Sequence, residues 1–156
     1  MKVKVITKLS VTQDVALVTL NKVPANVDFI CKIFDRLDEE GINVDMISQS
    51  PLTGSFVAVS FTTSSDSMVK VAALVNEFRQ ECPSIRPLFS HHNIKISLYG
   101  ADMPQHHGIA ASVFRLLRDC GTEVLMITTS SVDISVLVDD ASWEECVKRL
   151  QEKLEL

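Results

Sequence analysis

Two stretches of this 156-residue chain resemble each other at a constant offset of eighty positions. Residues 28–50 align with residues 108–130, and identical side chains recur in the same register. The matched pairs are Phe34 and Phe114, Leu37 and Leu117, Gly41 and Gly121, Val44 and Val124, Met46 and Met126, Ile47 and Ile127, and Ser50 and Ser130. Such self-similarity indicates an internal repeat. The chain is therefore predicted to fold as two copies of one unit.

Each copy contains the same order of elements. Apolar residues with helical spacing predict helices over 29–37 and 109–117, which end near Gly41 and Gly121. Apolar residues on one face predict a second helix in each copy, from Met68 to Phe78 and from Trp143 to Leu154. Runs rich in branched residues predict strands at 15–20, 43–49 and 56–61 in the first copy, and at 94–99, 123–129 and 134–138 in the second.

This order predicts an α+β fold of two ferredoxin-like βαββαβ modules, each with its helices on one face of an antiparallel sheet. Residues 85–90 can supply the last strand of the first module, whereas the second module ends with its helix. A spare strand, residues 2–10, lies at the N-terminus, where Val3, Val5, Thr7 and Leu9 alternate with Lys2, Lys4, Ile6 and Lys8. We expect it to complete the second module (93–156), so that this module interleaves with the first (11–92).

Charge and hydropathy exclude two classes of partner. The formal charge of −5 has the wrong sign for a protein that neutralises nucleic acid phosphates. No segment approaches the roughly 18 apolar residues that a bilayer helix needs. We therefore expect a cytoplasmic protein that binds neither nucleic acid nor membrane.

The cysteines and histidines give weak signals for chemistry. Cys31, Cys82, Cys120 and Cys146 form no C-x-x-C pair, so reduced and mostly buried thiols are expected rather than a thiol enzyme. Two histidine pairs, 91–92 and 106–107, would be possible ligands for zinc or nickel. Adjacent residues of a strand point to opposite faces, however, and polar residues are ordinary at loop edges. No metal and no cofactor are predicted.

Particular motifs resemble a known family. GINVDMISQ at 41–49, HGIAASVF at 107–114, ITTS at 127–130 and ISVLVD at 134–139 look like the paired ACT domains that form the regulatory region of aspartate kinases. The resemblance covers nearly the whole chain. It implies that the modules pair with those of another chain in an eight-stranded sheet, and that lysine or threonine binds where modules meet.

The resemblance also implies which residues contact the effector in the first module. One group lies in the loop before the first helix and the other on the second strand: Asn26, Val27, Asp28, Phe29 and Ile30, and Val44, Asp45, Met46, Gln49 and Ser50. Backbone N–H groups at a helix N-terminus attract a carboxylate, and the Asp45 carboxylate can hold an ammonium group. Solvated, structural roles for Asp45, Gln49 and Ser50 remain open.

The first module departs from the family pattern at the loop before its helix, whereas the second module keeps the glycine of that loop and departs at Glu123, Leu125 and Ser131. Val27 and Asp28 stand where the first module usually has Pro-Gly, and Asp28 adds negative charge where a carboxylate should bind. The second module keeps Gly108, which favours a site formed by His107, Gly108, Ile109 and Ala110.

The resemblance, together with the absence of a G-x-x-x-x-G-K loop, implies a regulatory, amino-acid-binding dimer without a catalytic site of its own. Its expected partner is a kinase catalytic domain or subunit, and the chain could be free-standing, a subunit or part of a longer kinase. The alternative is a structural dimerisation module whose ligand site has decayed, as Asp28 suggests.

Overall fold

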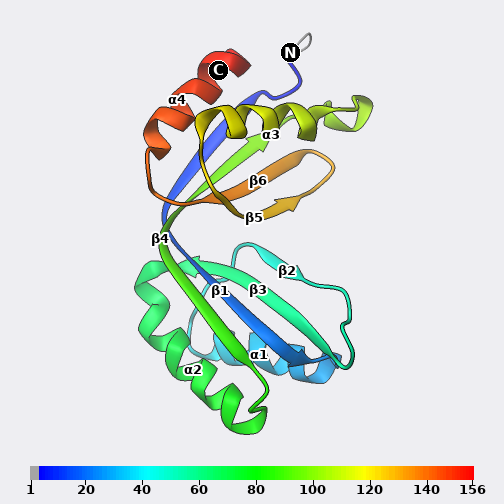
Figure 1. The fold of residues 1–156 in the computed structure, drawn as a ribbon, viewed down its shortest axis with the longest axis vertical. Helices are drawn as coiled ribbons and strands as arrows, with labels where there is room; N and C mark the ends of the chain where they lie inside the picture. Colours follow the sequence, from blue (N-terminus) through cyan, green and yellow to red (C-terminus); the bar gives the residue numbers. More distant parts are fainter. Residues whose placement is uncertain (1–3) are drawn as a thin grey trace. The chain divides into compact units, whose positions relative to one another are not determined.

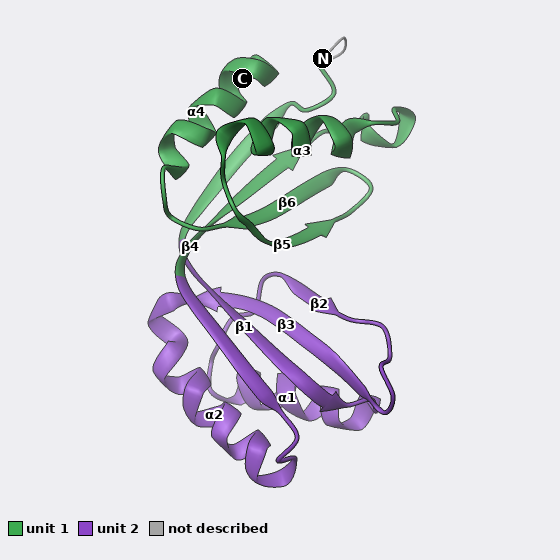
Figure 2. Ribbon diagram, in the orientation of Figure 1, with its two compact units in different colours: residues 1–13, 92–156 green, residues 14–91 purple. Residues whose placement is uncertain are grey.

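A computed structural model describes residues 4–156 of the chain, which form two compact units (Figures 1 and 2). Unit 2 comprises residues 14–91, and unit 1 joins residues 92–156 to the N-terminal segment that ends at Gln13. Two long strands, β1 (Lys8–Pro24) and β4 (Arg86–Tyr99), each contribute residues to both units. The remaining elements belong to one unit or the other.

Unit 2 is a four-stranded sheet covered by two helices. Its strands follow the order β2-β3-β1-β4, in which β2 (Ile47–Gln49) and β3 (Phe56–Ser64) pair antiparallel, as do β3 and β1. Helix α1 (Val27–Glu39) follows β1, and a short 3₁₀ turn, η1 (Ser65–Ser67), leads into α2 (Met68–Glu81).

The core of unit 2 lies between the helices and the sheet. Ile33 of α1 and Val71 of α2 are fully buried, together with Val18 and Leu20 of β1 and Phe61 of β3. The apolar stripe of each helix therefore faces the sheet, as its helical periodicity predicts.

Unit 1 repeats the plan. Its strand order is β1-β4-β6-β5, with β6 (Asp133–Val138) antiparallel to both β4 and β5 (Val124–Thr129). A 3₁₀ turn, η2 (Met103–Gln105), precedes α3 (Ile109–Cys120), and α4 (Trp143–Leu154) follows β6. Val113, Leu117 and Leu150 fill the core between these helices and the sheet. The predicted α+β class with two ferredoxin-like units is confirmed.

The predicted strands at 85–90 and 94–99 are joined in one strand, β4. At the N-terminus, Lys2 and Val3 of the predicted strand lie outside the described residues, and β1 begins only at Lys8. Val5 and Ile6 are nevertheless buried in the core of unit 1, and the Thr7 N–H donates to the Tyr99 carbonyl at 2.8 Å. The chain before β1 thus follows the end of β4.

Strand β2 is shorter than the predicted span of 43–49. Residues before it still bond to β3, but side chains replace part of the ladder: the Met46 N–H donates to Thr62 Oγ1 at 2.9 Å, and Thr63 Oγ1 donates to the Asn43 carbonyl at 2.6 Å. Regular pairing begins at Ile47. In the part of the chain that the structure describes, no helix has the length and apolarity needed to span a bilayer.

Candidate functional site

The loop between β1 and α1 closes the N-terminus of α1 with a side chain. The Ala25 N–H donates to the Ser55 carbonyl at 3.0 Å, which fixes the loop against the start of β3. Asn26 then caps the helix, because its Oδ1 accepts the Phe29 N–H at 2.7 Å. Val27 is 77% exposed, and Asp28 is exposed in the first turn. The side-chain amide of Asn26 therefore occupies the N-terminus of α1, and Asp28 adds a negative charge there.

Phe29, Ile30 and Met46 contribute mainly to packing. Phe29 is 7% exposed and its ring meets that of Phe78 edge-on at a centroid distance of 6.5 Å. Met46 is 3% exposed, and Ile30 packs half-buried against the same core. These side chains pack against the core beneath the loop and the strand. Any contact that these residues make with a ligand would therefore be mainly through their backbone.

The candidate effector residues in and beside the second strand, β2, bond to β3 at two separate places. The Ser50 N–H donates to the Ala58 carbonyl at 2.9 Å, and the Ala58 N–H donates to Ser50 Oγ at 2.8 Å. Ser50, with Gln49 beside it, thus lies at the end of β3 that also holds the Asn26 loop. The Asp45 N–H pairs with the Thr62 carbonyl at 3.0 Å, about 13 Å farther along β3 at the strand rise. Within one chain, Asp45 is therefore not beside the α1 opening.

The corresponding opening in unit 1 is built differently. Gly108 precedes α3 with a φ of 82°, and no side chain caps the helix. The Ser112 N–H and Oγ both donate to the Gly108 carbonyl, at 3.0 and 3.1 Å. A Cβ added at Gly108 would meet nothing within 4 Å, so backbone conformation rather than crowding requires glycine here.

The surroundings of this opening differ from those of the α1 opening, and Arg115 donates to Ser112 Oγ at 3.2 Å within the first turns of α3. His107, Gly108 and Ala110 are exposed, whereas Ile109 packs partly buried against the core. The first turn of α3 contains no acidic residue, in contrast to that of α1. First-turn N–H groups of a helix have no partner within the helix, and they carry partial positive charge. The α3 opening can therefore accept a small carboxylate from solvent.

The histidines and cysteines are the remaining candidates for chemistry that the sequence offers. Among residues 4–156, no three His, Cys, Asp or Glu side chains lie close enough to hold a metal ion. Cys146 is buried and Cys82 and Cys120 are half-buried, but Cys31 is exposed, contrary to the expectation of mostly buried thiols. Cys31 lies on the outer side of α1, where it donates to Asp35, and this carboxylate raises the pKa of the thiol. The signal for its exposure was its position beside the core-facing Ile30 rather than on the apolar stripe.

Comparison with known proteins agrees with this architecture. A model of the ACT domain family matches residues 96–154. The aspartokinase of Corynebacterium efficiens is 29% identical over 158 aligned positions, which cover all of this chain and 38% of that enzyme. The chain therefore spans well under half the length of the curated relatives it matches.

Solved structures resemble the chain over nearly its full length. The ligand-free regulatory subunit of aspartate kinase from Thermus thermophilus is 24% identical with a TM-score of 0.84, covering 95% of this chain and 97% of that subunit. An aspartokinase composed of alpha and beta subunits contains a chain that is 26% identical with a TM-score of 0.84, covering 97% of this chain and 99% of that one. The resemblance carried by the GINVDMISQ and ITTS motifs is thus confirmed.

Proposed function

We propose that this chain, whose two units correspond to the tandem ACT regulatory region of aspartate kinases, binds a free amino acid and thereby controls a kinase catalytic domain or subunit. The observation that carries the proposal is the N-terminus of α3 at Gly108, which has neither a side-chain cap nor an acidic residue in its first turn. An amino acid places its carboxylate on the first-turn N–H groups and leaves its ammonium group and side chain to neighbouring residues.

Lysine and threonine are the first ligands to test. The resemblance to the kinase regulatory region implies both, and aspartokinase III of Escherichia coli, which shares this fold at 23% identity, has been crystallised in complex with lysine and aspartate. We place the effector at His107, Gly108, Ile109 and Ala110. The corresponding loop of unit 2, from Asn26 to Ile30, is the weaker site because Asp28 repels a carboxylate.

Regulation follows from differential affinity. A bound amino acid can shift the partner kinase only to the extent that it binds one conformation of the assembly more tightly than another, typically by about 1–3 kcal/mol. We propose that the chain forms a homodimer through its ACT units. Pairing of edge strands between two copies would cover main-chain groups that edges such as β2 and β5 otherwise leave open.

The experiment is a thermal-shift screen of the chain against the twenty amino acids, followed by titration calorimetry. An effector at a hundred times its dissociation constant stabilises the protein by about 2.7 kcal/mol. Gly108→Asp should abolish this stabilisation, since it places a carboxylate at the α3 opening. Gly121→Asp is the matched control, because Gly121 also has a positive φ of 68° but lies at the other end of α3.

Loss of the shift in both variants would indicate that strain in α3 rather than the opening is responsible. If no amino acid stabilises the unmodified chain at millimolar concentration, the alternative holds, and the chain is a structural dimerisation module. Sedimentation of a dimer with no effector response would favour that alternative directly.

A further inference from the structure

Two thiols of unit 1 meet where its helices pack together. Cys120 is the last residue of α3, and Cys146 lies near the start of α4. Cys120 Sγ donates a weak hydrogen bond to the Cys146 carbonyl at 3.8 Å. The two thiol groups also interact with each other, which is one of the causes that raise the pKa of Cys146. Both cysteines are in the free form.

The two thiols differ in access to solvent. Cys120 is half-buried and forms part of the wall of a cavity of about 320 Å³ between α3 and α4, together with Leu116, Arg149 and Lys153. Cys146 is 3% exposed within the core. A small oxidant can therefore reach Cys120 from the cavity, whereas Cys146 is shielded from solvent and does not line that cavity.

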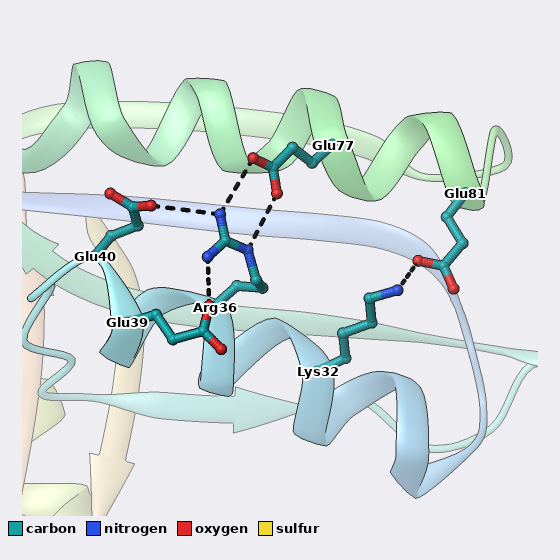
Figure 3. Close-up of polar contacts among 6 residues, drawn as sticks. All are labelled: Lys32, Arg36, Glu39, Glu40, Glu77 and Glu81. Carbon is teal, nitrogen blue, oxygen red and sulfur yellow. Dashed lines mark hydrogen bonds and ion pairs between the residues drawn. The ribbon is translucent and has the colours of Figure 1, made fainter.

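The equivalent helix pair of unit 2 has ion pairs between its two helices instead. Figure 3 shows Arg36 of α1 paired with Glu77 of α2, at 3.2 Å, and Lys32 of α1 paired with Glu81 of α2. At the repeat offset of eighty, Glu40 occupies the position of Cys120. Among residues 4–156 no ion pair joins α3 to α4, although Arg149 of α4 donates to the Asp119 carbonyl of α3 at 3.3 Å. The thiol pair thus lies between two helices that, over the described residues, have no ion pair joining them.

We propose that Cys120 and Cys146 form a reversible intramolecular disulfide that links α3 to α4 when the protein meets hydrogen peroxide. The Cys120 thiolate attacks a peroxide oxygen, the O–O bond breaks, and Cys120 becomes a sulfenic acid as hydroxide leaves. The Cys146 sulfur then attacks Cys120 Sγ, the S–O bond breaks, and water leaves as the disulfide forms. Two thiols are oxidised and the peroxide is reduced to water.

The second step should limit the rate. Burial, above all, raises the pKa of Cys146 to about 12, so this residue is a thiol at neutral pH and a weak nucleophile. Its thiolate fraction rises about tenfold per pH unit below that pKa. Formation of the disulfide from the sulfenic acid should accelerate accordingly between pH 7 and pH 9.

The test treats the full chain with hydrogen peroxide and then alkylates the remaining thiols under denaturing conditions. Two of the four cysteines should resist alkylation, a peptide linking Cys120 to Cys146 should appear in non-reducing mass mapping, and dithiothreitol should restore both thiols. Oxidation should also raise Tm, because the disulfide restricts the unfolded chain.

Variants separate this pair from the other thiols. Cys120→Ser should abolish the cross-link, whereas Cys31→Ser, which removes an exposed thiol from α1, should leave it intact. Cys146→Ala should trap Cys120 as a sulfenic acid that dimedone labels. If Cys146→Ala does not fold, Cys120→Ser still tests the proposal, since Cys120 is only half-buried. Four alkylatable thiols after oxidation, a link to Cys31 or Cys82, or a link between chains would overturn it.

Discussion

The helices that open the two halves of the repeat, α1 and α3, begin in different ways. Asn26 caps α1 through a 2.7 Å hydrogen bond to the Phe29 N–H, and Asp28 adds an acid to the first turn. Gly108 precedes α3 with neither a cap nor an acid. Capping stabilises a helix by the same N–H groups that would otherwise bind an anion. The α1 opening therefore favours stability, whereas the α3 opening lacks a side-chain cap that would compete with the binding we propose.

The difference is local, because the units beneath these openings are alike. Each has two helices on a four-stranded sheet and a separate apolar core. A duplicated unit can lose a ligand site in one copy without losing its fold, since the core and the opening depend on different residues. The predictions below test this separation, beginning with the cores.

Ile33→Ala and Leu117→Ala should have the largest effects. Ile33 of α1 is 0% exposed and Leu117 of α3 is 2% exposed, so each substitution leaves a cavity and should cost about 2–5 kcal/mol of unfolding free energy. Urea denaturation measures the loss, and hydrogen exchange locates it. Each variant should lose protection first in the helices of its own unit. Equal loss in both units would show that the two cores unfold as one.

The sequence predicted the helices well because their apolar stripes and terminal glycines are local signals. Gly41 and Gly121 have φ values of 70° and 68° just beyond α1 and α3, a conformation that glycine adopts without strain. Phe34 and Phe114 match at the offset of eighty residues, and such matches revealed the internal repeat. The fold class was then predicted from the order of elements in each copy. The apolar periodicity of the sequence therefore predicts the helices correctly, because each helix packs against the sheet of its own unit.

Strand boundaries were harder to predict because they depend on partners distant in sequence. Nothing local indicates that residues 85–90 and 94–99 form one strand, or that Thr62 and Thr63 side chains bond to the backbone before Ile47 and shorten β2. The cap by Asn26 was also missed. Asn three residues before the first buried position, Phe29, is a common capping pattern that could have indicated it.

Asp28→Asn should make the α1 opening more like that of α3, because it removes the acidic group from the first turn. Removing one exposed charge about 4 Å from a bound carboxylate relieves about 1 kcal/mol, so the affinity of unit 2 for an amino acid should rise about fivefold. The same change should lower stability by a few tenths of a kcal/mol, because the acid favours the helix N-terminus. Calorimetric titration measures the expected gain in affinity, and thermal unfolding measures the expected loss of stability.

Asp38→Asn is the control for Asp28→Asn. It removes an exposed carboxylate from the last turn of α1, far from the opening, and should leave affinity unchanged. A similar gain of affinity in both variants would mean that overall charge, rather than the position of Asp28, limits binding.

Asn26→Ala should cost about 1 kcal/mol of stability, because the Phe29 N–H loses its acceptor. Asn26→Asp keeps an oxygen in place and should preserve the stability of the folded chain. Thermal unfolding of both variants measures the difference. Equal losses would mean that the amide NH₂ of Asn26, and not its oxygen, stabilises the loop.

Arg36→Ala should have the smallest effect, although Arg36 makes several ion pairs. Its guanidinium contacts Glu77 across the helix pair, Glu39 in the last turn of α1 and Glu40 just beyond that helix (Figure 3). Glu77 and Glu39 raise its pKa. The glutamates are 42–60% exposed, so solvent screens the pairs. A double-mutant cycle with Glu77→Ala should give a coupling energy of at most about 1 kcal/mol that decreases in high salt. A larger, salt-independent coupling would mean that charge holds α1 to α2 as firmly as a disulfide would hold α3 to α4.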